Sequence, residues 1–158
     1  MEQTILPKKI KIAIFFMLAI GALTLHQFVF IINITKIRLS QIAYSQYGIF
    51  SVILKNLEIL LVAILFIVFA CFLKKRKKWA WIAAMVILLK ETVAGIKAVP
   101  LLFSVQLPHL GYLMEHLPPL ISIFLLITMI ASLFSYILIL VALILLISER
   151  KKYWQIAS

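Results

Sequence analysis

The sequence predicts an all-α integral membrane protein, organised as a four-transmembrane-helix bundle with short loops. Of the 158 residues, 65% are hydrophobic and the mean hydropathy is +1.17, whereas a soluble domain is apolar at about 45 to 50% of its positions. The apolar residues form continuous runs, not the alternating pattern of a membrane β-barrel. Lysine and arginine residues cluster outside these runs. Together these three observations define the class.

Four apolar runs are each long enough to cross a bilayer, whose hydrocarbon core requires roughly 20 helical residues. They cover residues 12–34, 49–73, 79–99 and 121–147. No remaining stretch is long enough to act as a linker between domains or as a repeat. We therefore expect residues 1–158 to form a single transmembrane domain.

The net charge of +11 is explained by membrane topology. Basic residues precede the first run, fill the KKRKK turn at 74–78 and follow the fourth run at 150–152. The opposite side carries only Lys36 and Arg38. Under the positive-inside rule this pattern predicts a multi-pass protein of the cell membrane with both termini in the cytoplasm. Binding of the KKRKK turn to anionic lipid is an alternative; no nucleic-acid partner is expected.

The composition argues against an enzyme. The chain has no Asp and a single cysteine, Cys71, which excludes an aspartate dyad and a CxxC pair. It has no phosphate-binding glycine loop and no nucleophile motif. His109, Glu115 and His116 share one outer connection, but an adjacent Glu and His point about 100° apart on a helix. We therefore expect no metal and no cofactor.

The third run is unusual because it carries Lys90, Glu91 and Lys97 inside the predicted span. An ionisable residue near mid-membrane costs about 2.5 to 3.5 kcal/mol, whereas each Leu, Ile, Val or Phe returns only about 0.3 to 0.6 kcal/mol. The third run is therefore marginal as an isolated span. Neighbouring helices must shelter its charges.

Ionisable residues of the other runs lie at a similar depth. At about 1.5 Å per residue from the inner ends, Lys90 and Glu91 lie roughly 17 Å deep, and His26 and Glu58 roughly 21 to 22 Å deep. Such a layer indicates either a ligand or ion site or a set of structural ion pairs. Its candidate residues are His26, Lys55, Glu58, Lys90, Glu91 and Lys97.

Two of these residues have a simpler interpretation. Lys55 and Glu58 are spaced i, i+3, so they can form an interfacial ion pair with Lys55 reaching outward. His26 can be a neutral histidine bonded to a neighbouring helix, or a titrating group near Glu58 or Glu91.

Stripes of small and polar residues predict which helix faces contact other helices. The stripes are Ala19, Ala22, His26 and Asn33 in the first run, Asn56, Ala63 and Ala70 in the second, Ala80, Ala84, Ile87, Glu91, Ala94 and Ala98 in the third, and Thr128, Ala131, Ser132, Ser135 and Ala142 in the fourth. For the fourth run, lining of a polar pathway is the alternative to simple packing. After this run, Tyr153 and Trp154 are expected at the inner membrane interface.

Two functions are compatible with these patterns. The first is an accessory or interaction subunit of a membrane complex, which requires only a buried polar layer and a membrane-protein partner. The alternative is a small transporter or channel, in which the Glu, Lys and His residues pass a proton, an ion or a polar ligand. Because the chain is short for a complete transporter, that alternative predicts a homo-oligomer.

Overall fold

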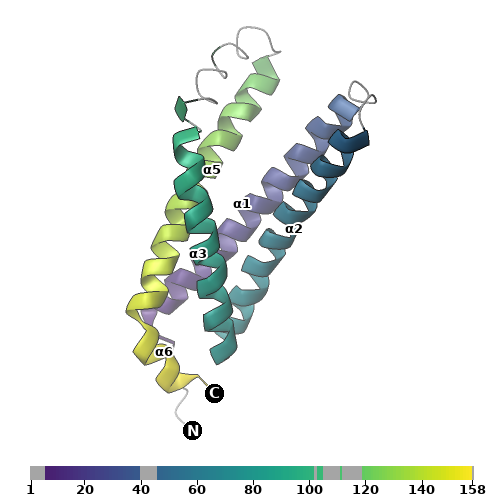
Figure 1. Cartoon of the computed structure of the whole chain (residues 1–158). Helices are drawn as coiled ribbons and strands as arrows, with labels where there is room; N and C mark the ends of the chain where they lie inside the picture. The colour runs from purple at the N-terminus through teal and green to yellow at the C-terminus, as the bar shows by residue number, and fades with distance from the viewer. Residues whose placement is uncertain (1–5, 40–45, 102, 105–110, 112–118, 158) are drawn as a thin grey trace.

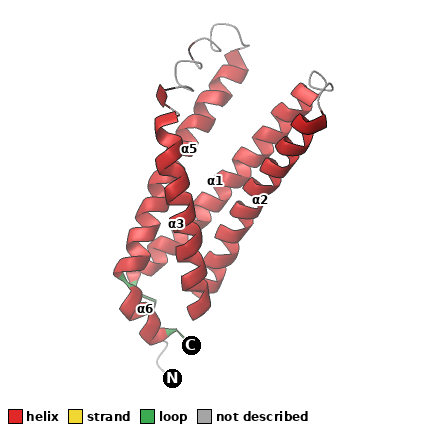
Figure 2. Ribbon diagram, in the orientation of Figure 1, coloured by secondary structure: helices red, strands yellow, loops and turns green. Residues whose placement is uncertain are grey.

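The computed structural model describes residues 6–39, 46–101, 103–104, 111 and 119–157. Within these ranges the regular secondary structure is helical and contains no strand, as Figure 2 shows. The helices are α1 (Lys8–Leu39), α2 (Gln46–Lys74), α3 (Lys78–Leu101), α5 (Pro119–Ser148) and α6 (Arg150–Ile156). The four long helices coincide with the four predicted runs.

Three of these helices are long and apolar enough to cross a membrane. The qualifying segments are Lys8–Val29 in α1, Asn56–Lys74 in α2 and Leu126–Ser148 in α5, with mean hydropathies of 2.1, 2.7 and 2.9. The helix α3 is not among the three. At 24 residues it is about 36 Å long, which is sufficient for a span. Lys90, Glu91 and Lys97 lower its average hydropathy.

Figure 1 shows the four long helices running up and down, with the chain termini and the α2–α3 turn at one end. We call this the inner end. The helix α1 packs against α2 and α5, and α3 also packs against α2 and α5. The helices therefore form a ring in which α1 lies opposite α3. The pair α1 and α2 separates from the pair α3 and α5 toward the other, outer end.

The apolar core occupies the inner half of this ring. Among the described residues, its fully buried large side chains include Met17 and Ile20 of α1, Phe66 of α2, Leu88 of α3 and Leu146 of α5. In α2 and α3, Phe66 and Leu88 lie on the inner side of Glu58 and Glu91, respectively.

A glycine allows α1 and α2 to approach closely. A Cβ atom on Gly21 would lie 2.7 Å from Cγ1 of Ile67 and 3.2 Å from the backbone oxygen of Ala63. Ala63 and Ala70 are fully buried, which confirms that these two positions of the predicted second-run stripe form a helix contact. Small residues here permit the close packing that holds membrane helices together.

The turn between α2 and α3 ends α2 in a defined way. The N–H of Lys77 donates to the Phe72 carbonyl (3.2 Å), and the N–H of Arg76 donates to the Leu73 carbonyl (3.0 Å). Arg76 has a φ of 60°, the left-handed conformation expected at this position of a Schellman motif. The KKRKK turn is therefore compact, so α3 starts immediately beside the end of α2.

The C-terminal helix α6 folds back onto this turn. Tyr153 is fully buried, and its hydroxyl donates to the backbone oxygens of Lys77 (3.1 Å) and Leu73 (3.4 Å). The burial of Tyr153 was not predicted from the sequence, because it depends on the packing of α6 against the α2–α3 turn; its position at the membrane interface stays a prediction. Trp154 packs edge to face against Trp81, with ring centroids 6.1 Å apart.

Candidate functional site

An ion-pair cluster joins α2 and α3 just outside the apolar core. The ammonium nitrogen of Lys90 lies 3.2 Å from Oε1 of Glu58 and 3.4 Å from Oε1 of Glu91. Glu91 follows Lys90 on α3, about 100° around the helix, so the lysine side chain bridges its own neighbour and the facing helix. One cation is thus shared by two carboxylates.

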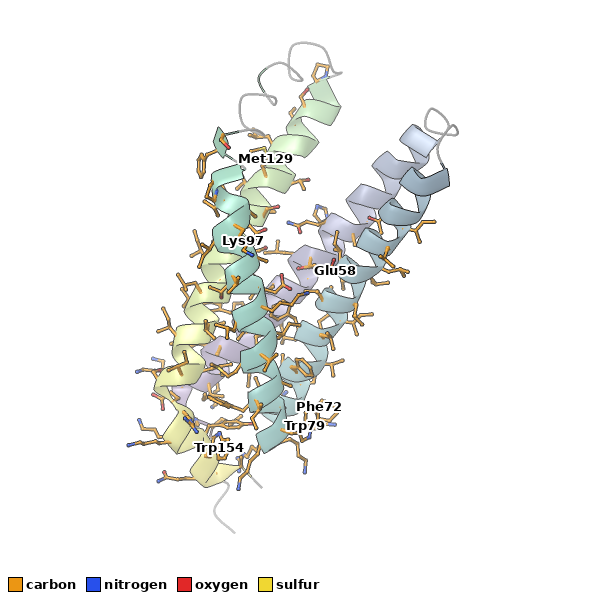
Figure 3. The ribbon with its side chains drawn as sticks, viewed as in Figure 1. Glu58, Phe72, Trp79, Lys97, Met129 and Trp154 are labelled. Atoms are coloured by element: carbon orange, nitrogen blue, oxygen red, sulfur yellow. The ribbon has the colours of Figure 1, made fainter. Side chains whose placement is uncertain are left out.

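The two carboxylates have different surroundings. The side chain of Glu91 is 18% exposed, whereas those of Glu58 and Lys90 are 61% and 56% exposed. Glu91 therefore lies between the helices, whereas Glu58 and Lys90 lie at the surface of the helix bundle. Figure 3 shows Glu58 on α2 and Lys97 on α3 on opposite sides of the space where the helix pairs separate.

A cavity of about 280 Å³ lies beside this cluster, between the four long helices. Both carboxylates line it, Glu58 from α2 and Glu91 from α3. Its remaining polar lining comes from α1 and α5 and consists of Thr24, Gln27, Ser132, Ser135 and Tyr136. Each long helix therefore contributes at least one polar side chain to a single cavity.

Hydrogen bonds connect the α1 and α5 sides of the cavity. The amide nitrogen of Gln27 donates to the hydroxyl of Ser132 at 2.9 Å, and that hydroxyl donates to the Thr128 backbone oxygen at 2.8 Å. Thr24 and Ser135 donate to the backbone oxygens of residues four positions earlier, each at 2.8 Å. These bonds give the hydroxyl groups fixed orientations.

Apolar side chains close the inner end of the cavity. Ile20, Phe66 and Ile139 line it and are 1%, 1% and 4% exposed. They belong to α1, α2 and α5 and lie on the inner side of the polar residues of those helices. Together they form a floor that separates the cavity from the inner end of the molecule.

The structure brings Glu58, Lys90 and Glu91 together, and it leaves His26 and Lys97 apart from them. Lys97 is exposed and lies one heptad beyond Lys90 on the same face of α3, roughly 10 Å farther out. Lys55 lies outside the side chains that the structure describes, as do His109, Glu115 and His116 of the predicted outer connection.

His26 does not take part in the cavity. It is exposed and lies about 100 to 160° around α1 from the lining residues Ile20, Thr24 and Gln27. Ala22 is also exposed. These two positions of the predicted stripe therefore face away from the other helices of this chain, since the packed face of α1 runs through Met17, Ile20 and Thr24; their contact with a partner protein stays a prediction.

Several cavity residues carried no strong signal in the sequence. Gln27 and Thr24 are single polar residues in an apolar run, and their helical spacing of three is the only pattern that links them. Tyr136 is oriented by Gly95, since a Cβ atom there would lie 2.7 Å from Cδ1 of the tyrosine ring. Ser135 belonged to the fourth-run stripe, for which lining of a polar pathway was the alternative interpretation.

The inner end of the molecule is closed by charge pairs and aromatic packing. Glu149, 5% exposed, precedes α6, and its two carboxylate oxygens each lie 3.5 Å from a lysine nitrogen, one of Lys9 and one of Lys152. Arg150 lies over the rings of Trp81 and Trp154, at 5.8 and 5.7 Å from their centroids. The start of α1 is thereby linked to the residue that precedes α6, and α6 is linked to the start of α3.

Comparisons with protein-family models, curated proteins and solved structures found no match to this chain. The class of the protein therefore follows only from the physical properties of its fold and site. The chain is an all-helical protein with three helices apolar enough to span a membrane.

Proposed function

We propose that this protein is a small membrane transporter or channel that binds a cation in the cavity between its four long helices. The observation that supports the proposal is that Glu58 and Glu91 line one cavity with hydroxyl and amide groups from α1 and α5. Structural ion pairing alone requires Lys90 and the carboxylates, but no cavity beside them. Intramembrane carboxylates that face such a space commonly mark ion or proton paths.

The charge balance favours a cation over an anion. With all three groups ionised, Glu58 and Glu91 carry two negative charges and Lys90 supplies one positive charge. One negative charge is therefore left over, and electrostatic attraction to a cation strengthens as a charged group is withdrawn from water. Glu91 is the more shielded carboxylate, so we assign it the central role in binding.

The proposal includes a topology of four spans with both termini in the cytoplasm. The start of α1, the α2–α3 turn and α6 all lie at the inner end in Figure 1, and the basic clusters of the sequence belong to these three segments, as the positive-inside rule requires of a cytoplasmic face. In this orientation the cavity lies toward the outer side. Passage through the protein would require the floor and the α6 contacts to open.

Flux through proteoliposomes tests this function. Purified protein is reconstituted with a pH-sensitive dye inside the vesicles, and acidification or alkalinisation is followed after a cation gradient is imposed. We expect flux that Glu91→Gln reduces at least tenfold. His26→Gln serves as the matched control, because His26 lies at a similar depth but faces away from the cavity; equal effects of the two substitutions, or no flux with any cation, would contradict the proposal.

A second candidate function is that of an accessory subunit, and a groove on α3 and α5 favours it. This groove of about 490 Å³ is lined by Gly95, Val99, Pro100, Leu133 and other apolar residues. Such a largely apolar groove suits a transmembrane helix of a larger membrane protein, because van der Waals packing drives the association of helices in a membrane. Purification in mild detergent tests it: a stoichiometric larger membrane protein supports the accessory function, and a homo-oligomer supports the transporter.

A further inference from the structure

Three of the four hydroxyl groups that line the polar cavity already donate their protons to backbone oxygens, and the fourth hydroxyl belongs to Tyr136. Thr24 donates to the Ile20 backbone oxygen and Ser135 donates to the Ala131 backbone oxygen, each at 2.8 Å. A hydroxyl has one O–H donor and two acceptor lone pairs. What these two groups still offer to a ligand is therefore the acceptor function.

Ser132 is committed in the same way. It donates to the Thr128 backbone oxygen and accepts from the Gln27 amide nitrogen, so only one lone pair remains on its oxygen. Gln27 keeps its carbonyl oxygen and one N–H. Together with the acceptor-only carboxylates of Glu58 and Glu91, these groups give the cavity more acceptors than donors. Its remaining donors are the second N–H of Gln27 and the hydroxyl of Tyr136.

An ammonium group already occupies the edge of this site. The terminal nitrogen of Lys90 lies 3.2 and 3.4 Å from the two carboxylates, although Lys90 is not among the residues that line the cavity. The protein's own side chain thus shows that the two carboxylates can hold an R–NH₃⁺ group between them.

The shape of the cavity adds a second requirement. Its polar residues lie on the outer side, whereas Ile20, Phe66 and Ile139 form an apolar floor. An apolar cavity of about 150 Å³ can hold a benzene ring, so 280 Å³ has room for several heavy atoms. The ligand that matches has a positively charged donor at one end and a short apolar body at the other.

We propose that the cavity binds a small organic ammonium ion, with its N–H groups directed to Glu91, Thr24 and Ser135 and its apolar body on Phe66 and Ile139. This inference rests on the proposed cation function and specifies its substrate class. An alkali ion could replace its water only with the oxygen atoms on the polar side of the cavity and would leave the apolar floor without a contact, whereas an organic ammonium ion matches both sides. When the ligand binds Glu91, Lys90 remains paired with Glu58.

Binding of n-propylammonium chloride to the purified full-length protein in lipid nanodiscs tests the inference by isothermal titration calorimetry. The comparison ligands are tetramethylammonium, which has the charge but no N–H donor; propionate, which has the opposite charge; and sodium and potassium chloride. We expect propylammonium to bind at least tenfold more tightly than tetramethylammonium. We expect no binding of propionate, and no displacement of propylammonium by an equal concentration of either alkali ion.

Two hydroxyl variants provide a matched pair. Thr24→Val removes a hydroxyl group from the cavity. Thr92→Val is the control: the Thr92 hydroxyl also donates to a backbone oxygen four residues earlier, that of Leu88 at 2.7 Å, but Thr92 lines the groove on α3 and α5 and not the cavity. Thr24→Val should weaken propylammonium binding about tenfold, the loss typical of a hydrogen bond to a charged group. Thr92→Val should leave it unchanged. Glu91→Gln should weaken binding about 100-fold.

The outcomes separate this inference from the function on which it rests. Binding of sodium or potassium in preference to propylammonium overturns the organic-ammonium assignment and leaves the cation function standing. Equal effects of Thr24→Val and Thr92→Val overturn the role of the acceptor groups. If no tested cation binds, the inference is overturned, and the proteoliposome flux then decides separately whether the cation function survives.

Discussion

Lys90 and Glu58 are 32 residues apart in the sequence, yet the lysine nitrogen lies 3.2 Å from a carboxylate oxygen of the glutamate. This contact joins α3 to α2 at the level where the apolar core ends. It also places Glu91, the next residue, at the cavity between all four long helices. The charges that make α3 a poor span by itself are therefore the ones that connect it to its neighbours.

Replacing this charge cluster distinguishes packing from function. We expect the double variant Lys90→Met with Glu91→Leu to remain folded, with a free energy of unfolding unchanged or higher, because the side chains of Lys90 and Glu58 are more than half exposed and such an ion pair contributes only about 0 to 1 kcal/mol. Glu58 keeps contact with solvent since its side chain is 61% exposed. The same variant should lose cation flux.

Unfolding in a detergent titration and flux in proteoliposomes measure the two effects side by side. A folded double variant with full flux would assign the cluster to packing alone. A double variant that does not fold would show that the charges are required for assembly of the helices, contrary to our expectation.

The contact between α1 and α2 depends on the absence of a side chain at Gly21. Gly21→Val should destabilise the protein by about 1 to 3 kcal/mol, the usual cost of overpacking, because the backbone of Ala63 would lie within 3.2 Å of the new Cβ atom. The adjacent exposed position gives a control: Ala22→Val should change stability by less than about 0.5 kcal/mol. Melting temperatures in detergent that fall equally for both variants would contradict the close approach.

Tyr153 should make stability depend on pH in the alkaline range. Burial raises the pKa of Tyr153 from 10.0 to about 12, so between these values the unfolded chain has lost the phenolic proton and the folded protein has kept it. Stability from this group is therefore fully present below about pH 10 and is lost as the pH rises toward 12, by at most about 3 kcal/mol.

Thermal unfolding at several pH values from 8 to 11.5 measures this linkage against Tyr153→Phe. The phenylalanine variant loses the hydroxyl's hydrogen bonds, about 1 kcal/mol, but it cannot ionise. Its stability should decline less steeply above pH 10 than that of the wild type. Parallel pH curves for the two proteins would show that Tyr153 does not remain protonated in the folded state.

Membrane topology is tested with introduced cysteines in a Cys71→Ala background. Ser104→Cys lies after α3, toward the outer end, and Lys75→Cys lies in the α2–α3 turn. In intact cells an impermeant thiol reagent should label Ser104→Cys and should label Lys75→Cys only after permeabilisation. The reverse pattern would place the termini outside, and labelling of both sites on one side would show that α3 does not cross.

The sequence by itself determined the helical membrane class, the approximate extents of the four long helices and the presence of charges in the third one. These features are local: continuous apolar runs and the placement of basic residues between them can be read without knowing any contact. The matched depths of Glu58, Lys90 and Glu91 were also predictable, because helical rise converts residue number into distance along an axis.

Only the tertiary structure decided which face of each helix meets the others. His26 and Gln27 are neighbours in the sequence, but the rotation of α1 places Gln27 at the cavity and leaves His26 exposed. Tyr153 likewise became buried because α6 packs on the α2–α3 turn. The physical reason is that depth follows from chain position alone, whereas rotation about the helix axis is set by side-chain packing between segments distant in sequence.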